Sequence, residues 1–108
     1  MTLTLAATPL GNPGDASLRL KEAIASAEVI AAEDSRRFHR LAADLGITFT
    51  ARVISFFDGN ETVRTEEVLA LLQSGKKVLV VSDAGMPTIS DPGFRLTRDA
   101  IAIGIEVI

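Results

Sequence analysis

The chain has 108 residues, of which 47% are hydrophobic, enough for one domain with a single core. Its 11 Lys and Arg against 14 Asp and Glu give a net charge of −3, which excludes a domain that binds nucleic acid through overall positive charge. It has no cysteine and a single histidine, His39, which excludes disulfides, thiolate zinc sites and histidine-rich metal sites.

The start of the chain lacks the basic residues of a signal peptide, and it has no apolar run long enough to span a membrane, so we expect a soluble cytoplasmic protein.

The first part of the chain predicts a strand, a turn and a helix. Residues 3–7 suggest the strand, which ends before Pro9 because proline has no backbone N–H to donate. The turn LGNPG at 10–14 precedes a helix that Asp15 or Ser17 can cap.

A second strand leads into a segment of mixed charge. Residues 29–32, VIAA, fit a short buried strand, and the acids Glu33 and Asp34 follow it directly. The next helix starts with a cluster of cations, which comprises Arg36, Arg37 and Arg40. Gly46 ends this helix as a cap. The two acids fit either a helix cap or a functional site, and the arginines also fit a solvated face paired with local acids.

The third strand is predicted at residues 53–56, and the loop FDGNE at 57–61 connects it to a helix that ends at Gly75. We expect Phe56 and Phe57 to belong to the core rather than to form a stacking platform for a base. The end of the loop, Asn-Glu, also fits a simple capping turn at the start of the helix.

The fourth strand and the loop after it form the leading candidate for a ligand site. Residues 78–81, VLVV, fit a strand buried on both faces. The loop SDAGMPTISDPG at 82–93 contains two glycines, two prolines and two aspartates. Open α/β sheets place ligands at the carboxyl ends of parallel strands, where this loop begins. Taken alone, the loop also fits a tight turn before a helix that starts near Pro92.

The last part of the chain predicts one more helix and one more strand. Phe94, Leu96, Ile101 and Ile103 are expected on the helix, Gly104 closes it, and residues 105–108 begin the strand. Five alternations of strand and helix specify an α/β fold with a mostly parallel five-stranded sheet and helices on both faces. Because the chain stops inside a hydrophobic strand, we expect it to be one domain of a longer protein.

Common catalytic motifs are absent from the sequence. No GxGxxG follows the first strand, and neither GxxxxGK[ST] nor GxSxG occurs, so a Rossmann dinucleotide site, a P-loop and a hydrolase nucleophile are not predicted. The loops at the carboxyl ends of the strands carry carboxylates, hydroxyls and small residues instead. This composition suits a ligand with ribose hydroxyls and an amino group.

Four ordered segments together carry a family resemblance: ATPLGNPGD at 7–15, AAEDSRR at 31–37, GNE at 59–61 and VSDAGMPTISDPG at 81–93. They resemble the amino-terminal domain of the tetrapyrrole methylase superfamily. They are most similar to the branch that methylates the 2′-hydroxyl of a cytidine in 16S ribosomal RNA of the small ribosomal subunit. The resemblance implies a two-domain enzyme, usually a homodimer, that holds S-adenosyl-L-methionine between its domains and needs no metal. This chain would be the amino-terminal domain alone.

The resemblance also implies roles for individual residues. The cofactor contacts would be Leu10, Gly11, Asp83, Ala84, Gly85 and Met86. The substrate side would be lined by Asn12, Asp15, Ser35, Arg36, Asn60, Glu61, Ser90 and Asp91, with Arg37 and Arg40 as contacts to RNA phosphates. Glu33 and Asp34 would line this side as well. Because a carboxylate can accept the proton of the 2′-hydroxyl during methyl transfer, we expect Glu33 or Asp34 to be the catalytic base. Met86 departs from the superfamily, in which threonine is common at that position, so a hydroxyl contact is lost there.

Two other functions remain open at the level of sequence. Related enzymes methylate small molecules such as porphyrinoid rings, or a modified histidine in a protein. A nucleotide-binding regulatory module without chemistry is the alternative from a different class. The segment AAEDSRR favours the RNA substrate, because a basic cluster beside acidic loops suits a phosphate backbone.

Overall fold

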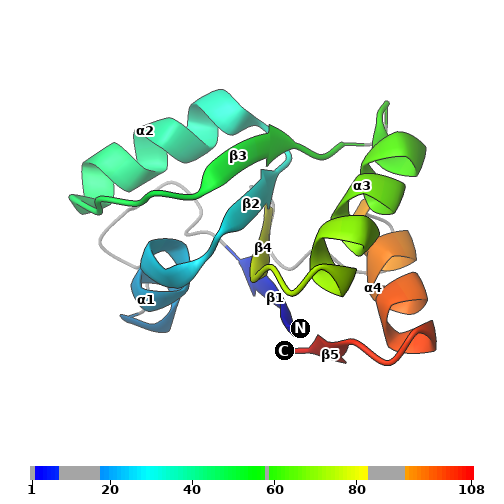
Figure 1. Ribbon diagram of the computed structural model, residues 1–108. Coiled ribbons are helices and arrows are strands. Elements are labelled where there is room, and N and C mark those ends of the chain that lie inside the picture. Colours follow the sequence, from blue (N-terminus) through cyan, green and yellow to red (C-terminus); the bar gives the residue numbers. More distant parts are fainter. Residues whose placement is uncertain (1, 8–17, 58, 83–91) are drawn as a thin grey trace.

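A computed structural model of the chain describes residues 2–7, 18–57, 59–82 and 92–108. Within these ranges, strands and helices alternate along the whole chain (Figure 1). The strands are β1 (Thr2–Ala7), β2 (Val29–Ala32), β3 (Arg52–Ser55), β4 (Val78–Ser82) and β5 (Glu106–Val107). The helices are α1 (Leu18–Ser26), α2 (Ser35–Leu45), α3 (Glu61–Gln73) and α4 (Pro92–Ala102). None of these helices is long and apolar enough to cross a membrane.

The strands form one five-stranded sheet in the order β3-β2-β4-β1-β5, and every neighbouring pair is parallel. The predicted fold class is therefore confirmed. The fourth strand of the chain, β4, lies at the centre of the sheet between β1 and β2. Its four apolar residues are all buried, as expected for a strand covered on both faces.

Alternate residues of β4 enter two separate halves of the core, because successive side chains of a strand point to opposite faces. Val78 and Val80 pack with Val68 and Leu72 of α3, and with Leu96 and Ala100 of α4. Leu79 and Val81 pack with residues of α1 and α2. Burying each such side chain stabilises the fold by roughly 1.5–3 kcal/mol. Figure 1 shows the resulting three layers, with α3 and α4 side by side on one face of the sheet.

The direction of the connections explains which helix covers which face. The chain passes from β1 to β2 and then β3 toward one edge of the sheet, and from β3 through β4 to β5 toward the other. Because crossovers between parallel strands are right-handed, opposite directions place the helices on opposite faces. The connections that leave β1 and β4 therefore diverge, although these two strands are neighbours.

Most predicted element boundaries are confirmed, and the region after the fourth helix contains one error. Gly46 caps α2 with a φ of 69° and Gly75 follows α3 with a φ of 93°, the left-handed conformation that glycine adopts without strain. The helix α4 ends at Ala102, so Ile103 lies outside it and is 47% exposed. Leu96 and Ala100, four residues apart, lie on the same face of α4 and are buried. Ile101 lies off that face and is 60% exposed.

Candidate functional site

Four neighbouring strands end at nearly the same level, and we call this side of the sheet the carboxyl edge. Ala7 at the end of β1 pairs with Ser82 at the end of β4. Ala32 at the end of β2 pairs with Val81 on one side and with Ser55 of β3 on the other. The segments that follow these strands therefore begin next to one another, as the sequence predicted from the parallel sheet.

The neighbouring strands β1 and β4 end side by side at the carboxyl edge, and the connections that leave them diverge to opposite faces. In open α/β sheets this topological switch point is where ligands bind. The segments after these two strands, 8–17 and 83–91, lie outside the described residues. They contain the predicted cofactor contacts Leu10, Gly11, Asp83, Ala84, Gly85 and Met86, and the predicted substrate contacts Asn12, Asp15, Ser90 and Asp91. The structure therefore places the strand ends that precede these residues. The roles of the residues themselves stay predictions.

Glu33 and Asp34 follow β2 at this edge, and their side chains differ in their contacts. Asp34 is the N-cap of α2: its Oδ1 accepts hydrogen bonds from the backbone N–H groups of Arg36 (3.0 Å) and Arg37 (3.2 Å). Glu33 is exposed, and no hydrogen bond or ion pair joins it to another residue in the described part of the chain. Glu33 therefore has a carboxylate available to a ligand, whereas Asp34 uses one oxygen to start the helix.

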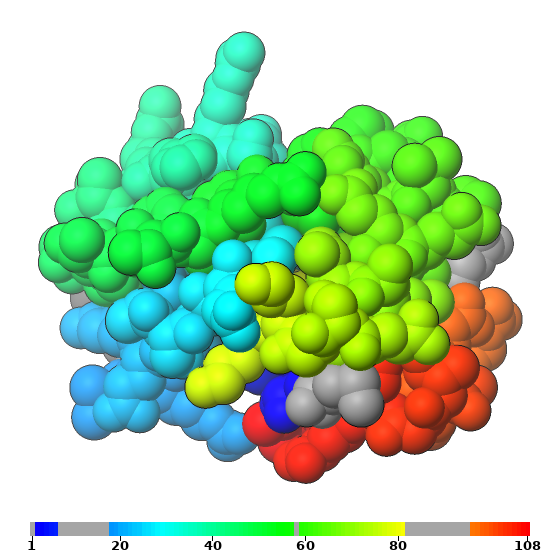
Figure 2. All heavy atoms as spheres, in the orientation of Figure 1, coloured from blue at the N-terminus to red at the C-terminus, as the bar shows by residue number. Residues whose placement is uncertain are grey.

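The helix α2 carries the predicted cations on its solvent-facing side. Its buried residues are Phe38 and Ala42, while Arg36, Arg37 and Arg40 are exposed. Arg37 lies 3.8 Å from Asp34 through its Nε, whereas Arg36 and Arg40 form no ion pair with any other described residue. Long side chains of α2 project well beyond the surrounding surface at the top of Figure 2. Such side chains can reach phosphates without distorting the fold.

The single histidine of the chain takes part in a small aromatic cluster beside this helix. The ring of His39 lies 5.7 Å from that of Phe49 and 6.2 Å from that of Phe38, measured between centroids. Phe38 and Phe49 also meet edge to face at 5.4 Å. The backbone segment after α2 is thereby packed against the helix. His39 therefore has a packing role in this arrangement.

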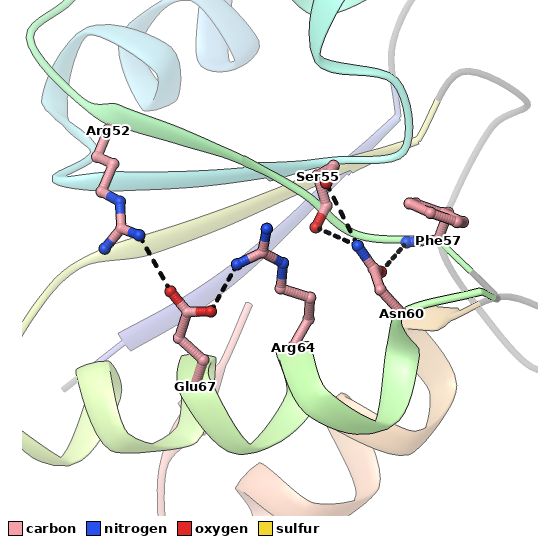
Figure 3. Close-up of polar contacts among 6 residues, drawn as sticks. All are labelled: Arg52, Ser55, Phe57, Asn60, Arg64 and Glu67. Atoms are coloured by element: carbon pink, nitrogen blue, oxygen red, sulfur yellow. Dashed lines mark hydrogen bonds and ion pairs between the residues drawn. The ribbon is translucent and has the colours of Figure 1, made fainter.

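Asn60 organises the segment that follows β3 (Figure 3). Its Nδ2 donates to the backbone oxygen of Ser55 (3.2 Å) and lies 3.3 Å from the Ser55 Oγ, while its Oδ1 accepts from the backbone N–H of Phe57 (2.9 Å). Asn60 is also the N-cap of α3, but its side chain makes no hydrogen bond to the helix. The predicted capping turn is therefore present, with the amide directed to the strand instead.

The two adjacent phenylalanines after β3 have different environments. Phe56 is 3% exposed and belongs to the core on the α3 and α4 face, as predicted. Phe57 is 43% exposed, so the prediction that it belongs to the core is wrong. The reason is geometric: successive residues of an extended segment point to opposite sides, and β3 is an edge strand with less structure around it. That period-two alternation was the sequence signal that could have separated the two residues.

The remaining described candidates lie at the starts of two helices. Ser35 is the first residue of α2, and Glu61 is the first residue of α3, where an acid is favoured by the helix dipole. Both are partly buried. Among the described residues, no group of three or more His, Cys, Asp or Glu side chains could hold a metal ion.

The opposite side of the sheet, the amino edge, carries charges that are paired with one another. Glu28, just before β2, accepts from the backbone N–H of Lys77 (3.1 Å) and lies 3.5 Å from the Lys76 Nζ. These contacts, the backbone hydrogen bond first, hold the pKa of the Glu28 carboxyl below its ordinary value of 4.5. Arg52, at the start of β3, pairs with Glu67 of α3 (3.3 Å), which also contacts Arg64 one turn earlier on the same helix (2.7 Å), as Figure 3 shows.

Comparison with known proteins gives a consistent result. Residues 2–108 match the sequence model of the tetrapyrrole (corrin/porphyrin) methylases. A protein of Mycobacterium tuberculosis named ribosomal RNA small subunit methyltransferase I is 52% identical over 105 residues, which are 97% of this chain and 37% of that protein. Proteins of the same name from Micromonospora olivasterospora and Escherichia coli O157:H7 are 44% and 41% identical, and the matches cover 33% and 36% of their lengths. The chain thus spans about a third of these curated relatives.

Proposed function

We propose a function for this chain from its family, because the chain belongs to the tetrapyrrole (corrin/porphyrin) methylases. It is the amino-terminal domain of a two-domain enzyme that transfers a methyl group from S-adenosyl-L-methionine to the 2′-hydroxyl of a cytidine in 16S ribosomal RNA. The relatives named above support this substrate, since each is named a ribosomal RNA small subunit methyltransferase. The proposed working state of the whole protein is a homodimer.

The cofactor is proposed to bind at the switch point between β1 and β4. Ala7 and Ser82, the last residues of these two strands, are paired, and their crossovers go to opposite faces, which is the arrangement at which open α/β sheets bind ligands. Leu10, Gly11, Asp83, Ala84, Gly85 and Met86 would hold it from this domain. S-adenosyl-L-methionine supplies a methyl group that its sulfonium sulfur activates for transfer.

The RNA is proposed to bind along the neighbouring part of the carboxyl edge. Arg36, Arg37 and Arg40 of α2 would contact phosphates, which positions the RNA without reading its sequence. The predicted substrate contacts Asn12, Asp15, Ser35, Glu61, Ser90 and Asp91 would complete this side, while Asn60 would hold the turn after β3 that borders it. The net charge of −3 fits a site in which only this local cluster is basic.

Of the two candidate bases, the geometry favours Glu33. Deprotonation of the acceptor hydroxyl needs a carboxylate oxygen that is free to accept a proton, and Asp34 already accepts two backbone N–H groups. Glu33 would take the proton as the hydroxyl oxygen forms its bond to the methyl carbon, and the bond from that carbon to sulfur breaks with its electrons staying on sulfur. Asp34 would keep the turn before α2 in place. Positioning of the hydroxyl in line with the breaking bond would supply much of the rate.

One observation carries the proposal. An exposed acid and exposed cations follow β2 at the carboxyl edge, one strand away from the switch point. The direct test is a chimera in which these 108 residues replace the matched 105 residues of the M. tuberculosis protein. We expect the chimera to transfer a labelled methyl group from S-adenosyl-L-methionine to small ribosomal subunits that lack the modification. The modified cytidine should resist alkaline cleavage, because a 2′-O-methyl group blocks it.

A chimera that folds, binds S-adenosyl-L-methionine and modifies no RNA would contradict the proposed substrate. Transfer to a porphyrinoid instead would support a small-molecule methylase, and binding without any transfer would support a regulatory module. Light scattering of the same chimera measures whether it is a dimer. The cofactor wall contributed by the rest of the protein is present in this design, so a negative result cannot come from its absence.

A further inference from the structure

At the carboxyl end of β3, two backbone groups on the open side of the strand form hydrogen bonds with the side chain of Asn60. The N–H of Arg52 donates to the carbonyl of Glu28, just before β2 (3.1 Å), and the N–H of Phe56 donates to the carbonyl of Ala32, the last residue of β2 (2.8 Å). Successive residues of a strand direct their backbone groups to opposite sides, so the carbonyl of Ser55 and the N–H of Phe57, on either side of Phe56, face away from β2. The Asn60 amide bonds to both, accepting from one and donating to the other. It therefore takes the place that a further strand would occupy.

The same residue also holds Phe57 from its other backbone group. The backbone N–H of Asn60 donates to the carbonyl oxygen of Phe57 at 3.0 Å, so both polar backbone groups of Phe57 bond to Asn60. Gly59 lies against the ring: a Cβ built there would be 2.5 Å from the Phe57 Cε2, so any side chain would displace it. The backbone of Phe57 is thus fixed, and its ring rests on a glycine.

The ring that this turn presents is not needed to fill the core. Phe57 is 43% exposed, while Phe56 beside it already fills the core position. The exposed aliphatic residues Leu18 and Ile101 lie on other elements, whereas Phe57 lies two residues after Ser55, the last residue of β3, at the carboxyl edge. Because Ala32 pairs with Ser55, Glu33 and Phe57 leave adjacent strands within one residue of the same level. Strands in such a pair lie about 5 Å apart.

We propose that Phe57 is a stacking platform for a base of the RNA substrate, and that Asn60 is the positioning residue that presents it. The proposal rests on the proposed function, since it assigns a contact within the same RNA site. Proteins that bind unpaired RNA combine cations along the phosphates with aromatic rings under the bases. Here α2 supplies the cations and the turn after β3 supplies the ring, on neighbouring strands of the carboxyl edge.

The test measures the affinity of the chimera for unmodified small ribosomal subunits by filter retention, over a series of salt concentrations. Base stacking on an aromatic ring corresponds to an affinity change of about 5- to 150-fold per base, so Phe57→Leu should weaken binding by that factor. Phe57→Tyr should bind like the parent, because it keeps the aromatic face. The salt dependence should be unchanged in Phe57→Leu, because stacking releases no counterions. Ile101→Ala, which truncates an exposed apolar side chain on α4, is the matched control.

Two further variants test whether Gly59 and Asn60 affect RNA binding by positioning the ring of Phe57. Gly59→Ala should weaken binding because its Cβ displaces the ring. Asn60→Ala should weaken binding in the parent and add little to Phe57→Leu, because a residue that acts through Phe57 has no effect once the ring is gone. If the losses of RNA affinity in Asn60→Ala and Phe57→Leu were additive in the double variant, Asn60 would not act by positioning Phe57. Melting temperatures of all variants report whether each one folds.

The outcomes separate this proposal from the proposed function. Equal affinity of Phe57→Leu and the parent, in a chimera that still transfers methyl groups, would overturn the stacking role alone. Loss of affinity in Phe57→Leu with recovery in Phe57→Tyr, in a chimera that transfers no methyl group, would support the stacking role and contradict the enzyme. A parent chimera that binds no RNA would overturn both.

Discussion

The two edges of the sheet use charged residues in opposite ways. At the amino edge, Glu28 accepts from the backbone N–H of Lys77 and pairs with the ammonium group of Lys76, and Arg52 at the start of β3 pairs with Glu67 of α3. At the carboxyl edge, Glu33, Arg36 and Arg40 form no ion pair with other residues of the described ranges. Both edges are accessible to water, so solvation alone does not cause the difference. Charges that serve only the fold can be paired within the chain, whereas Glu33, Arg36 and Arg40 stay available to a ligand, and Arg37 contacts Asp34 only at 3.8 Å.

The carboxyl edge also contains polar groups that do pair, and these have a structural role. Asp34 starts α2 and Asn60 closes the open side of β3. Each stands next to a residue whose functional group is exposed: Asp34 beside Glu33, and Asn60 within three residues of Phe57. At the carboxyl edge, Asp34 and Asn60 therefore stabilise the turns, and the turns hold Glu33 and Phe57 exposed to solvent.

The largest expected effect belongs to Glu33. In the chimera, Glu33→Gln removes the proposed proton acceptor and should lower kcat by about 10²- to 10⁴-fold, the usual contribution of a general base. The RNA affinity should change little, because the amide has nearly the same shape. Steady-state methyl transfer at saturating cofactor is the measurement. Asp44→Asn, at an exposed acid near the other end of α2, is the control that should keep kcat. An active Glu33→Gln enzyme would eliminate this residue as the base.

A smaller effect, on stability, is expected at Asp34. Asp34→Ala removes the acceptor for the N–H groups of Arg36 and Arg37 and should lower the free energy of unfolding by about 0.5–2 kcal/mol. Asp34→Asn keeps an oxygen that can accept both hydrogen bonds, so it should lose much less. Denaturant unfolding compares the three proteins. Equal stability of Asp34→Ala and the parent would show that the cap contributes nothing.

The smallest effect is expected at Glu28, on the amino edge, and it depends on pH. A carboxyl whose folded pKa is lowered stabilises the fold above its ordinary value of 4.5, and this stabilisation is lost as the pH falls through the folded pKa below 4.5. Glu28→Gln should therefore be less stable than the parent near neutral pH, and the difference should shrink on acidification. Melting temperatures between neutral pH and pH 3 measure it. Glu22→Gln, at an exposed acid of α1, should show no such trend. A difference that grows toward low pH would contradict the assigned contacts.

Much of this fold was predictable because its signals are local. The apolar runs at β2 and β4 and the glycines after α2 and α3 each specify an element by short-range chemistry. The division of β4 into two core faces follows from the same period-two pattern. The strand order could not be read locally, because it depends on which distant strands pair.

The site was predictable only in part, for a related physical reason. The motif around Glu33 and Asp34 indicated a functional segment, but the different contacts of the two acids depend on the backbone N–H groups at the start of α2. Period-two alternation could have separated Phe57 from Phe56, but the exposure of Phe57 also depends on β3 being an edge strand and on the Asn60 amide, which a hydrophobicity pattern does not contain. Side-chain contacts of this kind require the three-dimensional arrangement.

The central claim is that the carboxyl edge, and not the amino edge, binds the RNA. The most direct test compares two double variants of the chimera that each remove two positive charges: Arg36→Ala with Arg40→Ala, and Lys76→Ala with Lys77→Ala. We expect the arginine pair to weaken binding to small ribosomal subunits and to reduce the salt slope by about 0.7–0.9 for each lost phosphate contact. The lysine pair should bind like the parent. Equal losses from both pairs, or a loss from the lysine pair alone, would contradict the account.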